Sequence, residues 1–225
     1  MTDRAVSAQI DAAVADRAML KHPFYQAWTE GRLPLDTLRA YARQYFHHVE
    51  AFPQAVSAVH SACPERDGRR MLAENLAEEE GLEAGKQDHA SLWMMFACGL
   101  GESEEAVRGQ ALNTETQTLI DTFRRLSRKS YASGLGALYA YESQFPAVAT
   151  AKIDGLIERY GISDEETLRF FKVHQSADVE HSDVCRALLD RLPQADRCEA
   201  LAAGEELAGA LWGFLSGVEA SVTVN

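Results

Sequence analysis

The sequence predicts an all-α fold, a compact bundle of seven or more helices that forms one domain over residues 1–225. Apolar residues recur at helical spacing along most of the chain, and runs of strict alternation are scarce. With 225 residues and 46% hydrophobic content, the chain is long enough to bury one sizeable core. No repeat, low-complexity stretch or linker divides the sequence, so a single domain is expected.

The first half of the chain contains a series of predicted helices whose ends are marked by proline, glycine and capping residues. Asp36 is a candidate N-cap for the longest of them, which passes through Pro53 and is expected to bend there. Gly81 and Gly85 interrupt the pattern between the last two. The predicted helices cover about residues 5–20, 23–28, 36–62, 64–80 and 86–98.

The second half continues the helical pattern. Pro146 interrupts a long apolar segment, and Gly134 and Gly136 in that segment indicate close helix packing. Ser163 and Glu166 form a candidate capping box for the helix that follows. The predicted helices cover about residues 103–111, 115–128, 133–158, 163 to beyond 181, and 195–218.

Charge and composition exclude several classes of partner. The net charge of −12 is spread along the chain and lacks the basic footprint of a nucleic-acid-binding protein. The N-terminus has no apolar signal-peptide core, and no uncharged window reaches about 18 apolar residues, so a cytoplasmic protein without membrane contact is expected. The four cysteines are far apart, as is typical of reduced thiols.

The segment 174–181, with the sequence HQSADVEH, carries the clearest chemical signal. His174, Asp178 and His181 stand at i, i+4 and i+7, and helical steps of roughly 100° per residue place them on one stripe. Two imidazoles and a carboxylate in this register form half of a metal site. The alternative is a solvated polar face.

Three further candidates complete a ligand set. One carboxylate comes from the run Glu78–Glu80, whose position at a helix C-terminus is unfavourable without a nearby cation. His89 and Glu142 lie in otherwise apolar helices, where a lone buried charge needs a partner. Solvated charges or a core histidine are the alternatives. Six nitrogen and oxygen ligands without thiolate suit two iron or manganese ions with open positions.

These segments together resemble the heme-oxygenase-like di-metal oxidases. More narrowly, they resemble the Chlamydia protein associating with death domains (CADD) and its bacterial relatives. The resemblance spans nearly the whole chain. Its segments are KHPFYQAW (21–28), AFPQAVSAVH (51–60), NLAEEE (75–80), DHASLW (88–93), ALYAYESQFP (137–146), the 174–181 segment and LWGFL (211–215).

The resemblance implies a bundle of about seven helices with a Fe/Fe or Fe/Mn centre inside it. O2 and a reductant are the implied co-substrates, and a homodimer is the implied assembly. The connection from Glu79 to His89 is longer than the subfamily pattern, so Glu78, Glu80 or Glu83 remain alternatives to Glu79. The implied ligands are Glu79, His89, Glu142, His174, Asp178 and His181.

The subfamily resemblance also implies an activity, the formation of p-aminobenzoate for folate from the protein's own side chains. Tyr25 aligns with the tyrosine that supplies the ring, and Lys152 aligns with the lysine that supplies the amine. Tyr41 and Tyr141 match tyrosines near the site and are candidates to relay a radical. From the residues alone, Tyr25 resembles an ordinary core residue and Lys152 a surface charge.

Other functions remain open from the sequence. The same fold can oxidise or cleave an external amino acid or fatty acid, and it is shared by PqqC-like and TenA-like enzymes of cofactor metabolism. A TenA-like hydrolase needs a nucleophilic cysteine, for which Cys63 is a poor candidate because no base stands beside it in the sequence. A heme oxygenase would have only His22 as an N-terminal ligand. An interaction protein is the non-enzyme alternative.

Overall fold

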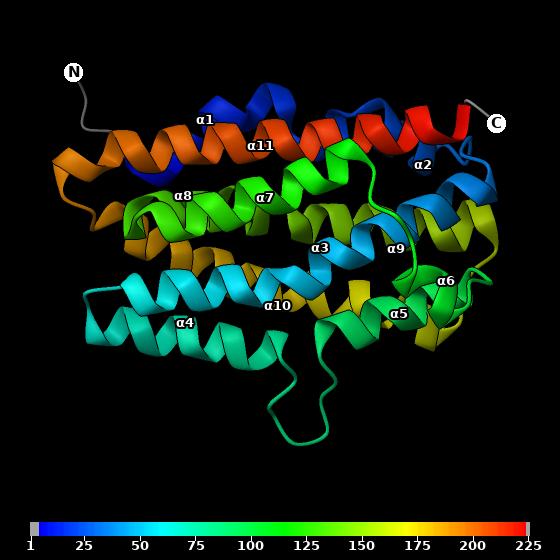
Figure 1. Ribbon diagram of the computed structural model, residues 1–225, viewed down its shortest axis with the longest axis horizontal. Helices are drawn as coiled ribbons and strands as arrows, with labels where there is room; N and C mark the ends of the chain where they lie inside the picture. The colour runs from blue at the N-terminus through cyan, green and yellow to red at the C-terminus, as the bar shows by residue number, and fades with distance from the viewer. Residues whose placement is uncertain (1–4, 224–225) are drawn as a thin grey trace.

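The computed structural model describes residues 5–223, apart from the side chains of Ser176, Val222 and Thr223, and all regular structure in this range is helical (Figure 1). The expected all-α bundle is therefore confirmed. The helices are α1 (Val6–Val14), α2 (Pro23–Thr29), α3 (Leu35–Ala62), α4 (Arg66–Glu79), α5 (His89–Gly99), α6 (Glu104–Arg108), α7 (Thr114–Lys129), α8 (Tyr131–Glu142), α9 (Phe145–Tyr160), α10 (Glu165–Asp190) and α11 (Gln194–Thr223). Two 3-10 turns, Ala15–Arg17 and Met19–Lys21, join α1 to α2.

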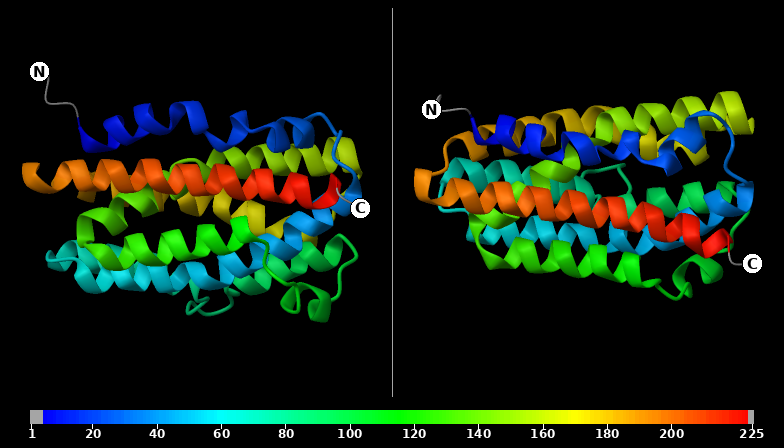
Figure 2. Two further views of the ribbon diagram at one scale, coloured as in Figure 1. Left: turned by 45° about the horizontal axis from the view of Figure 1, so that its top comes forward. Right: turned by 90° about the horizontal axis from the view of Figure 1, so that it is seen from above.

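The long helices run roughly along one common axis, and α8 lies at the centre of the bundle (Figures 1 and 2). This helix packs against α7, α10 and α11 and also contacts α3. Every residue from Ala132 to Glu142 is buried, as expected for a helix that is apolar on all sides. Glu142, at the end of α8, is thereby placed inside the protein.

Small residues allow α8 to approach its neighbours closely. A Cβ on Gly136 would lie 2.1 Å from the carbonyl oxygen of Ala200 in α11, and one on Gly134 would lie 2.5 Å from Cγ2 of Val59 in α3. Both distances are shorter than any tolerable contact, so these positions require glycine. The packing expected at Gly134 and Gly136 is confirmed.

The residues that precede two helices differ from the caps that the sequence predicts. Asp164, rather than Ser163, caps α10 by accepting a 2.9 Å hydrogen bond from the Thr167 amide. The α3 helix begins at Leu35, and Asp36 lies in its first turn, where it pairs with Arg39 instead of capping.

Two other helices also differ from the prediction in extent. The predicted helix over 133–158 is two helices, and Pro146 lies in the first turn of α9, where its missing N–H costs nothing. The predicted helix over 5–20 ends at Val14 and continues as the two 3-10 turns. Among the described helices, none is both long enough and apolar enough to cross a bilayer.

Candidate functional site

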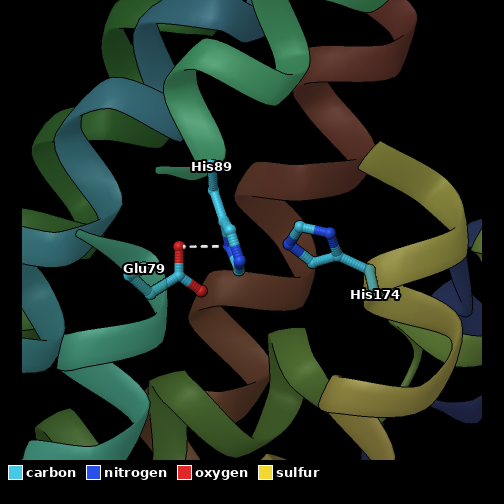
Figure 3. Close-up of side chains that lie close together, drawn as sticks. All are labelled: Glu79, His89 and His174. Atoms are coloured by element: carbon cyan, nitrogen blue, oxygen red, sulfur yellow. Dashed lines mark ion pairs between the residues drawn. The ribbon is translucent and has the colours of Figure 1, made fainter. Parts of the chain in front are cut away.

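Four helices bring the six predicted ligands into the interior of the bundle. The side chains come from the C-terminus of α4, the N-terminus of α5, the C-terminus of α8 and the middle of α10. All six are buried, with exposed fractions between 1% and 7%. Donor atoms of Glu79, His89 and His174 lie within 4.8 Å of one another, and Figure 3 shows these three side chains pointing toward one another from α4, α5 and α10.

The connection between α4 and α5 places Glu79 against His89. It projects from the bundle as a hairpin-like loop (Figure 1) and closes tightly, since a Cβ on Gly81 would lie 2.4 Å from the Asp88 amide nitrogen. Gly81 has a φ of 64°, which favours glycine. Asp88 then caps α5 by accepting a 2.7 Å hydrogen bond from the Ser91 amide. As a result, α5 begins at His89, later than the sequence predicts.

Among the candidate glutamates near this loop, Glu79 is the one aimed into the interior. Its Oε2 lies 2.7 Å from Nδ1 of His89, and both side chains are 3% exposed. Glu80 and Glu83 are exposed, and Glu78 is half-buried. The geometry therefore favours Glu79 as the first ligand, in agreement with the family resemblance.

His174 is held with one ring nitrogen engaged. Its Nδ1 lies 2.8 Å from the Phe170 carbonyl oxygen, and its ring stacks on that of Phe170 with centroids 4.0 Å apart. Burial, followed by the neighbouring His89, holds the pKa of His174 well below its usual range. A neutral imidazole with Nδ1 donating to a carbonyl has Nε2 available as a metal ligand.

Asp178 and His181 form the second part of the ligand set. Oδ1 of Asp178 lies 3.6 Å from Nδ1 of His181, which is too long for a hydrogen bond. Burial raises the pKa of Asp178 to about 7. Burial lowers the pKa of His181, but Asp178 and Glu142 outweigh that effect and raise it to about 9.

Glu142 lies between two neutral donors. The Asn75 amide donates to Oε1 at 2.9 Å, and the Cys185 thiol donates to Oε2 at 3.1 Å. Burial is the main cause of the raised pKa of Glu142. Neither donor supplies a charge to balance a buried carboxylate, so this side chain is also suited to meet a cation.

Buried polar atoms without partners show that the donor set fits metal ions. Among the described residues, Oδ2 of Asp178 and Nδ1 of His181 are buried and form no hydrogen bond within the chain. A buried polar atom without a hydrogen-bond partner is costly in free energy. Carboxylates and imidazoles, of which three each gather here, are oxygen and nitrogen donors that bind iron and manganese ions. Glu79, His89 and His174 therefore fit a metal ion, and the other predicted ligands are donors of the same chemical kind.

A second cluster lies beside the ligands and contains Tyr25, Tyr41 and Lys152. The Tyr25 and Tyr41 hydroxyls are 3.2 Å apart, and Nζ of Lys152 lies 2.6 Å from the Tyr41 hydroxyl. Nζ also lies 5.5 Å from the centroid of the Tyr25 ring. The structure thus brings together the two residues that the resemblance implies as ring and amine sources.

Lys152 is fully buried, which contradicts the interpretation of this residue, from its sequence alone, as a surface charge. It extends from α9 into a cage of aromatic rings that includes Tyr41, Trp93 and Phe171. Burial lowers the pKa of Lys152 well below its usual range, because the cage cannot solvate an ammonium ion. The neutral amine is a nucleophile.

Tyr45 extends this cluster toward the metal ligands, and the sequence analysis did not identify it as functional. Its ring stacks on Tyr41 with centroids 5.4 Å apart, and its hydroxyl lies 2.8 Å from that of Tyr141. Burial raises the pKa of both Tyr45 and Tyr141, and the Asp178 carboxylate adds to the shift in each. Tyr41 and Tyr45 are four residues apart on α3, and this i, i+4 spacing is the signal that could have revealed the pair.

Two other candidates from the sequence have structural roles. His22 caps α2 by accepting a 3.0 Å hydrogen bond from the Phe24 amide, while its Nε2 lies 2.9 Å from Ser216 Oγ. Both of its ring nitrogens are therefore engaged away from the ligand set. Cys63 is buried, and its thiol lies 3.5 Å from the Glu65 carbonyl oxygen.

Comparison with known proteins agrees with this geometry. The family model described as "Iron-containing redox enzyme" matches residues 39–213, a range that contains all six predicted ligands and Lys152. The chain belongs to this family of iron-containing redox enzymes. A member of an iron-containing redox family is expected to depend on metal, as the ligand set indicates.

Two relatives of this chain carry the name 4-aminobenzoate synthase. The protein of Chlamydia pneumoniae is 42% identical over 209 residues, which cover 92% of each chain. That of Nitrosomonas europaea is 39% identical over 229 residues, which cover 96% of this chain and 92% of the relative. The pyrroloquinoline-quinone synthase of Gluconobacter oxydans is more distant, with 23% identity over 97% of this chain and 92% of its own.

Solved structures show the same fold at low identity. A TenA homologue from Pseudomonas syringae superposes with a TM-score of 0.79 and 18% identity over 96% of this chain and 91% of its own. A heme oxygenase from Leptospira interrogans superposes with a TM-score of 0.61 and 13% identity over 95% of this chain and 99% of its own. The heme-oxygenase-like fold and the family resemblance seen in the sequence are both confirmed.

Proposed function

We propose that this protein is a 4-aminobenzoate (p-aminobenzoate) synthase that makes its product from its own Tyr25 and Lys152. The relatives that share about 40% identity over more than nine-tenths of the chain carry this name. The pyrroloquinoline-quinone synthase is far less similar, at 23% identity. The comparisons therefore favour 4-aminobenzoate over an external substrate or another cofactor pathway.

The chemistry of the product agrees with a tyrosine source. Cβ and the ring of tyrosine have the carbon skeleton of 4-aminobenzoate, with an oxygen at the para position where the product has nitrogen. Release of the product requires cleavage of the Cα–Cβ bond of Tyr25, oxidation of Cβ to a carboxylate, replacement of the para oxygen by the nitrogen of Lys152 and cleavage of the Cε–Nζ bond of that lysine. The overall change is oxidative, so it needs O2 and a source of electrons.

The observation that carries the proposal is the buried amine of Lys152, whose Nζ lies 5.5 Å from the centroid of the Tyr25 ring. An amine must be unprotonated to attack an electron-poor carbon, and burial in the aromatic cage favours that form because it lowers the pKa of Lys152. The Tyr41 hydroxyl contacts both the Lys152 amine and the Tyr25 hydroxyl, and so holds the two reactants in one place.

We propose that the six ligands hold two iron ions, or one iron and one manganese ion. Metals of this kind, when bound, would supply the redox chemistry that activates O2 with electrons from a reductant. The carboxylates of Glu79, Glu142 and Asp178 would balance the charge of the cations. The ligand set of three carboxylates and three imidazoles supports this assignment.

Four tyrosines form a path from Tyr141, which precedes the predicted ligand Glu142 in the sequence, to Tyr25. A tyrosine can lose an electron and a proton together because its radical is delocalised over the ring. Each phenol of the path keeps its proton at neutral pH, since burial raises the pKa of Tyr25, Tyr41, Tyr45 and Tyr141. Two hydroxyl contacts and one ring stack connect them, so an electron can pass along the path, and a proton can move with it at each hydroxyl contact.

Replacement of Tyr25 by phenylalanine tests the proposal. Tyr25→Phe retains the shape of the ring but lacks the para oxygen, so we expect loss of 4-aminobenzoate with unchanged metal content. Product is measured by mass spectrometry after Fe(II), reductant and O2 are added, and metal by elemental analysis. Undiminished product from this variant would show that Tyr25 is not the source.

A further inference from the structure

The two ring nitrogens of His181 have different surroundings. Nδ1 is buried, has no hydrogen-bond partner among the described residues and lies 3.6 Å from Oδ1 of Asp178. Nε2 lies 3.2 Å from Oε2 of Glu78. The ring is thus placed between an inner carboxylate of the ligand set and an outer carboxylate that is not part of it.

A histidine that binds a metal through one nitrogen commonly donates its other N–H to a carboxylate or carbonyl, which fixes the tautomer and the ring orientation. His174 shows this arrangement, with its Nδ1 2.8 Å from the Phe170 carbonyl oxygen. For His181, the group in the corresponding position is Glu78. The two histidines of α10 would then use opposite nitrogens toward the metal ions.

We propose that Glu78 is a positioning residue, which accepts the Nε2 proton of His181 and so presents Nδ1 of that ring to the metal centre. This inference rests on the metal centre of the proposed function. The neighbouring glutamates of α4 then have different roles. Glu79 is one of the ligands, and Glu78 orients the ligand His181 from outside the ligand set.

The surroundings of Glu78 agree with an outer role. Its side chain is 26% exposed, whereas that of Glu79 is 3% exposed. Its other oxygen, Oε1, lies 3.8 Å from Nζ of Lys86 in the α4–α5 loop. Glu78 and His89 also line a hollow of about 390 Å³ between that loop and α10, so Glu78 lies where solvent approaches the ligand set.

The tautomer of His181 tests the inference directly. Protein with 15N-labelled histidine is stripped of metal and loaded with Zn(II), a diamagnetic probe, and the ring nitrogens are assigned by NMR with a His181→Gln variant as reference. We expect His181 to carry its proton on Nε2 and to bind through Nδ1. A proton on Nδ1 with metal on Nε2 would overturn the inference.

Metal affinity provides the second readout. Apo-protein is titrated with Mn(II), and the free ion is measured by electron paramagnetic resonance for wild type, Glu78→Ala, Glu78→Gln and Glu80→Ala. We expect Glu78→Ala to weaken one of the two sites by about 10–100-fold. Glu78→Gln retains an acceptor oxygen, so its Mn(II) affinity should stay within about fivefold of the wild-type value. Glu80→Ala changes an exposed neighbour and should have the wild-type affinity.

The other outcomes of the metal titration contradict either the positioning role of Glu78 or the proposed function. Wild-type affinity in Glu78→Ala, with an unchanged unfolding temperature of the apo-protein, would show that Glu78 has no role at the centre. Equal losses in Glu78→Gln and Glu78→Ala would make Glu78 a direct ligand and overturn the positioning role. Failure of wild type to bind Mn(II), Fe(II) or Zn(II) would instead contradict the proposed function.

Discussion

The amine of Lys152 lies in an environment that opposes its usual charge. Aromatic rings surround Nζ, and the hydrogen bond to the Tyr41 hydroxyl is its polar contact in the structure. Burial of a polar group with so little compensation costs free energy. A residue that is unfavourable for stability yet central to the proposed chemistry is typical of functional sites.

Replacement of Lys152 by methionine should therefore separate stability from function. Lys152→Met keeps a similar length and removes the polar head. We expect the free energy of unfolding to stay constant or to rise by up to about 2 kcal/mol, because no amine is then desolvated. Product should be abolished while metal binding is retained.

Chemical denaturation and product analysis by mass spectrometry check this prediction. Lys172→Met is the matched control, because Lys172 is an exposed residue that pairs with Glu165. It should change stability by less than about 1 kcal/mol and leave product unchanged. A large loss of stability in Lys152→Met would mean that the amine is structural.

The sequence predicts some of these residues better than others. His174, Asp178 and His181 were recognisable because their chemistry and their helical register appear within one short segment. Tyr25 and Lys152 were identified through resemblance only. The burial of Lys152 depends on how α9 packs against α2 and α10, and that long-range contact is absent from the local pattern.

The α3 helix determines how the two clusters communicate. It carries Tyr41, which contacts Tyr25 of α2 and Lys152 of α9, and Tyr45, which contacts Tyr141 of α8. Since i, i+4 side chains lie on one face of a helix, the two rings stack along its axis. One turn of α3 thus bridges the ligand side and the substrate side of the site.

Removal of the Tyr45 hydroxyl should interrupt this bridge. In Tyr45→Phe the ring stays in place, but the 2.8 Å contact with the Tyr141 hydroxyl is lost and a phenylalanine ring is far harder to oxidise. We expect the rate of product formation to fall by at least about tenfold, equivalent to about 1.4 kcal/mol in the barrier. The measurement is a single-turnover time course.

The control for this variant is Tyr139→Phe, which removes a buried hydroxyl that donates to Asp11 at 2.9 Å on another side of α8. The free energy of unfolding of Tyr139→Phe should fall by about 1 kcal/mol, much as in Tyr45→Phe. Its rate of product formation should not change. Equal rates in Tyr45→Phe and wild type would exclude Tyr45 from the path.

Helix boundaries were less predictable than helix existence. Ser163 and Asp164 are adjacent and both can cap a helix, and only the geometry of the loop selects Asp164. The same limit applies to Glu78 and Glu79, which are equivalent in a charge run until the folded chain shows that one meets His181 and the other His89.

Across the whole molecule, metal binding, folding and protonation are linked. In the apo-protein the pKa of Asp178 is raised to about 7 and that of His181 to about 9. Both groups hold protons more tightly when folded than when unfolded, so their contribution to stability decreases as pH rises from about 4 to 9. Metal ligands must be deprotonated, so metal binding releases these protons.

The stabilisation by metal should consequently increase with pH. We expect the rise in unfolding temperature on addition of Mn(II) to be larger at pH 8 than at pH 6, since each proton released changes affinity by about tenfold per pH unit. Differential scanning calorimetry measures both shifts. In a His181→Ala variant, the rise in unfolding temperature on Mn(II) addition should depend less on pH. A rise that becomes smaller as pH increases would contradict the linkage between metal binding and proton release.

Isotope transfer from the protein to the product tests directly whether Tyr25 and Lys152 are the sources of 4-aminobenzoate. The protein is produced with 13C-labelled tyrosine and 15N-labelled lysine, loaded anaerobically with Fe(II), with or without Mn(II), and given reductant and O2 but no organic substrate. We expect 4-aminobenzoate that contains both labels, together with mass changes at Tyr25 and Lys152. Unlabelled product, or product that forms only when an external substrate is added, would contradict it.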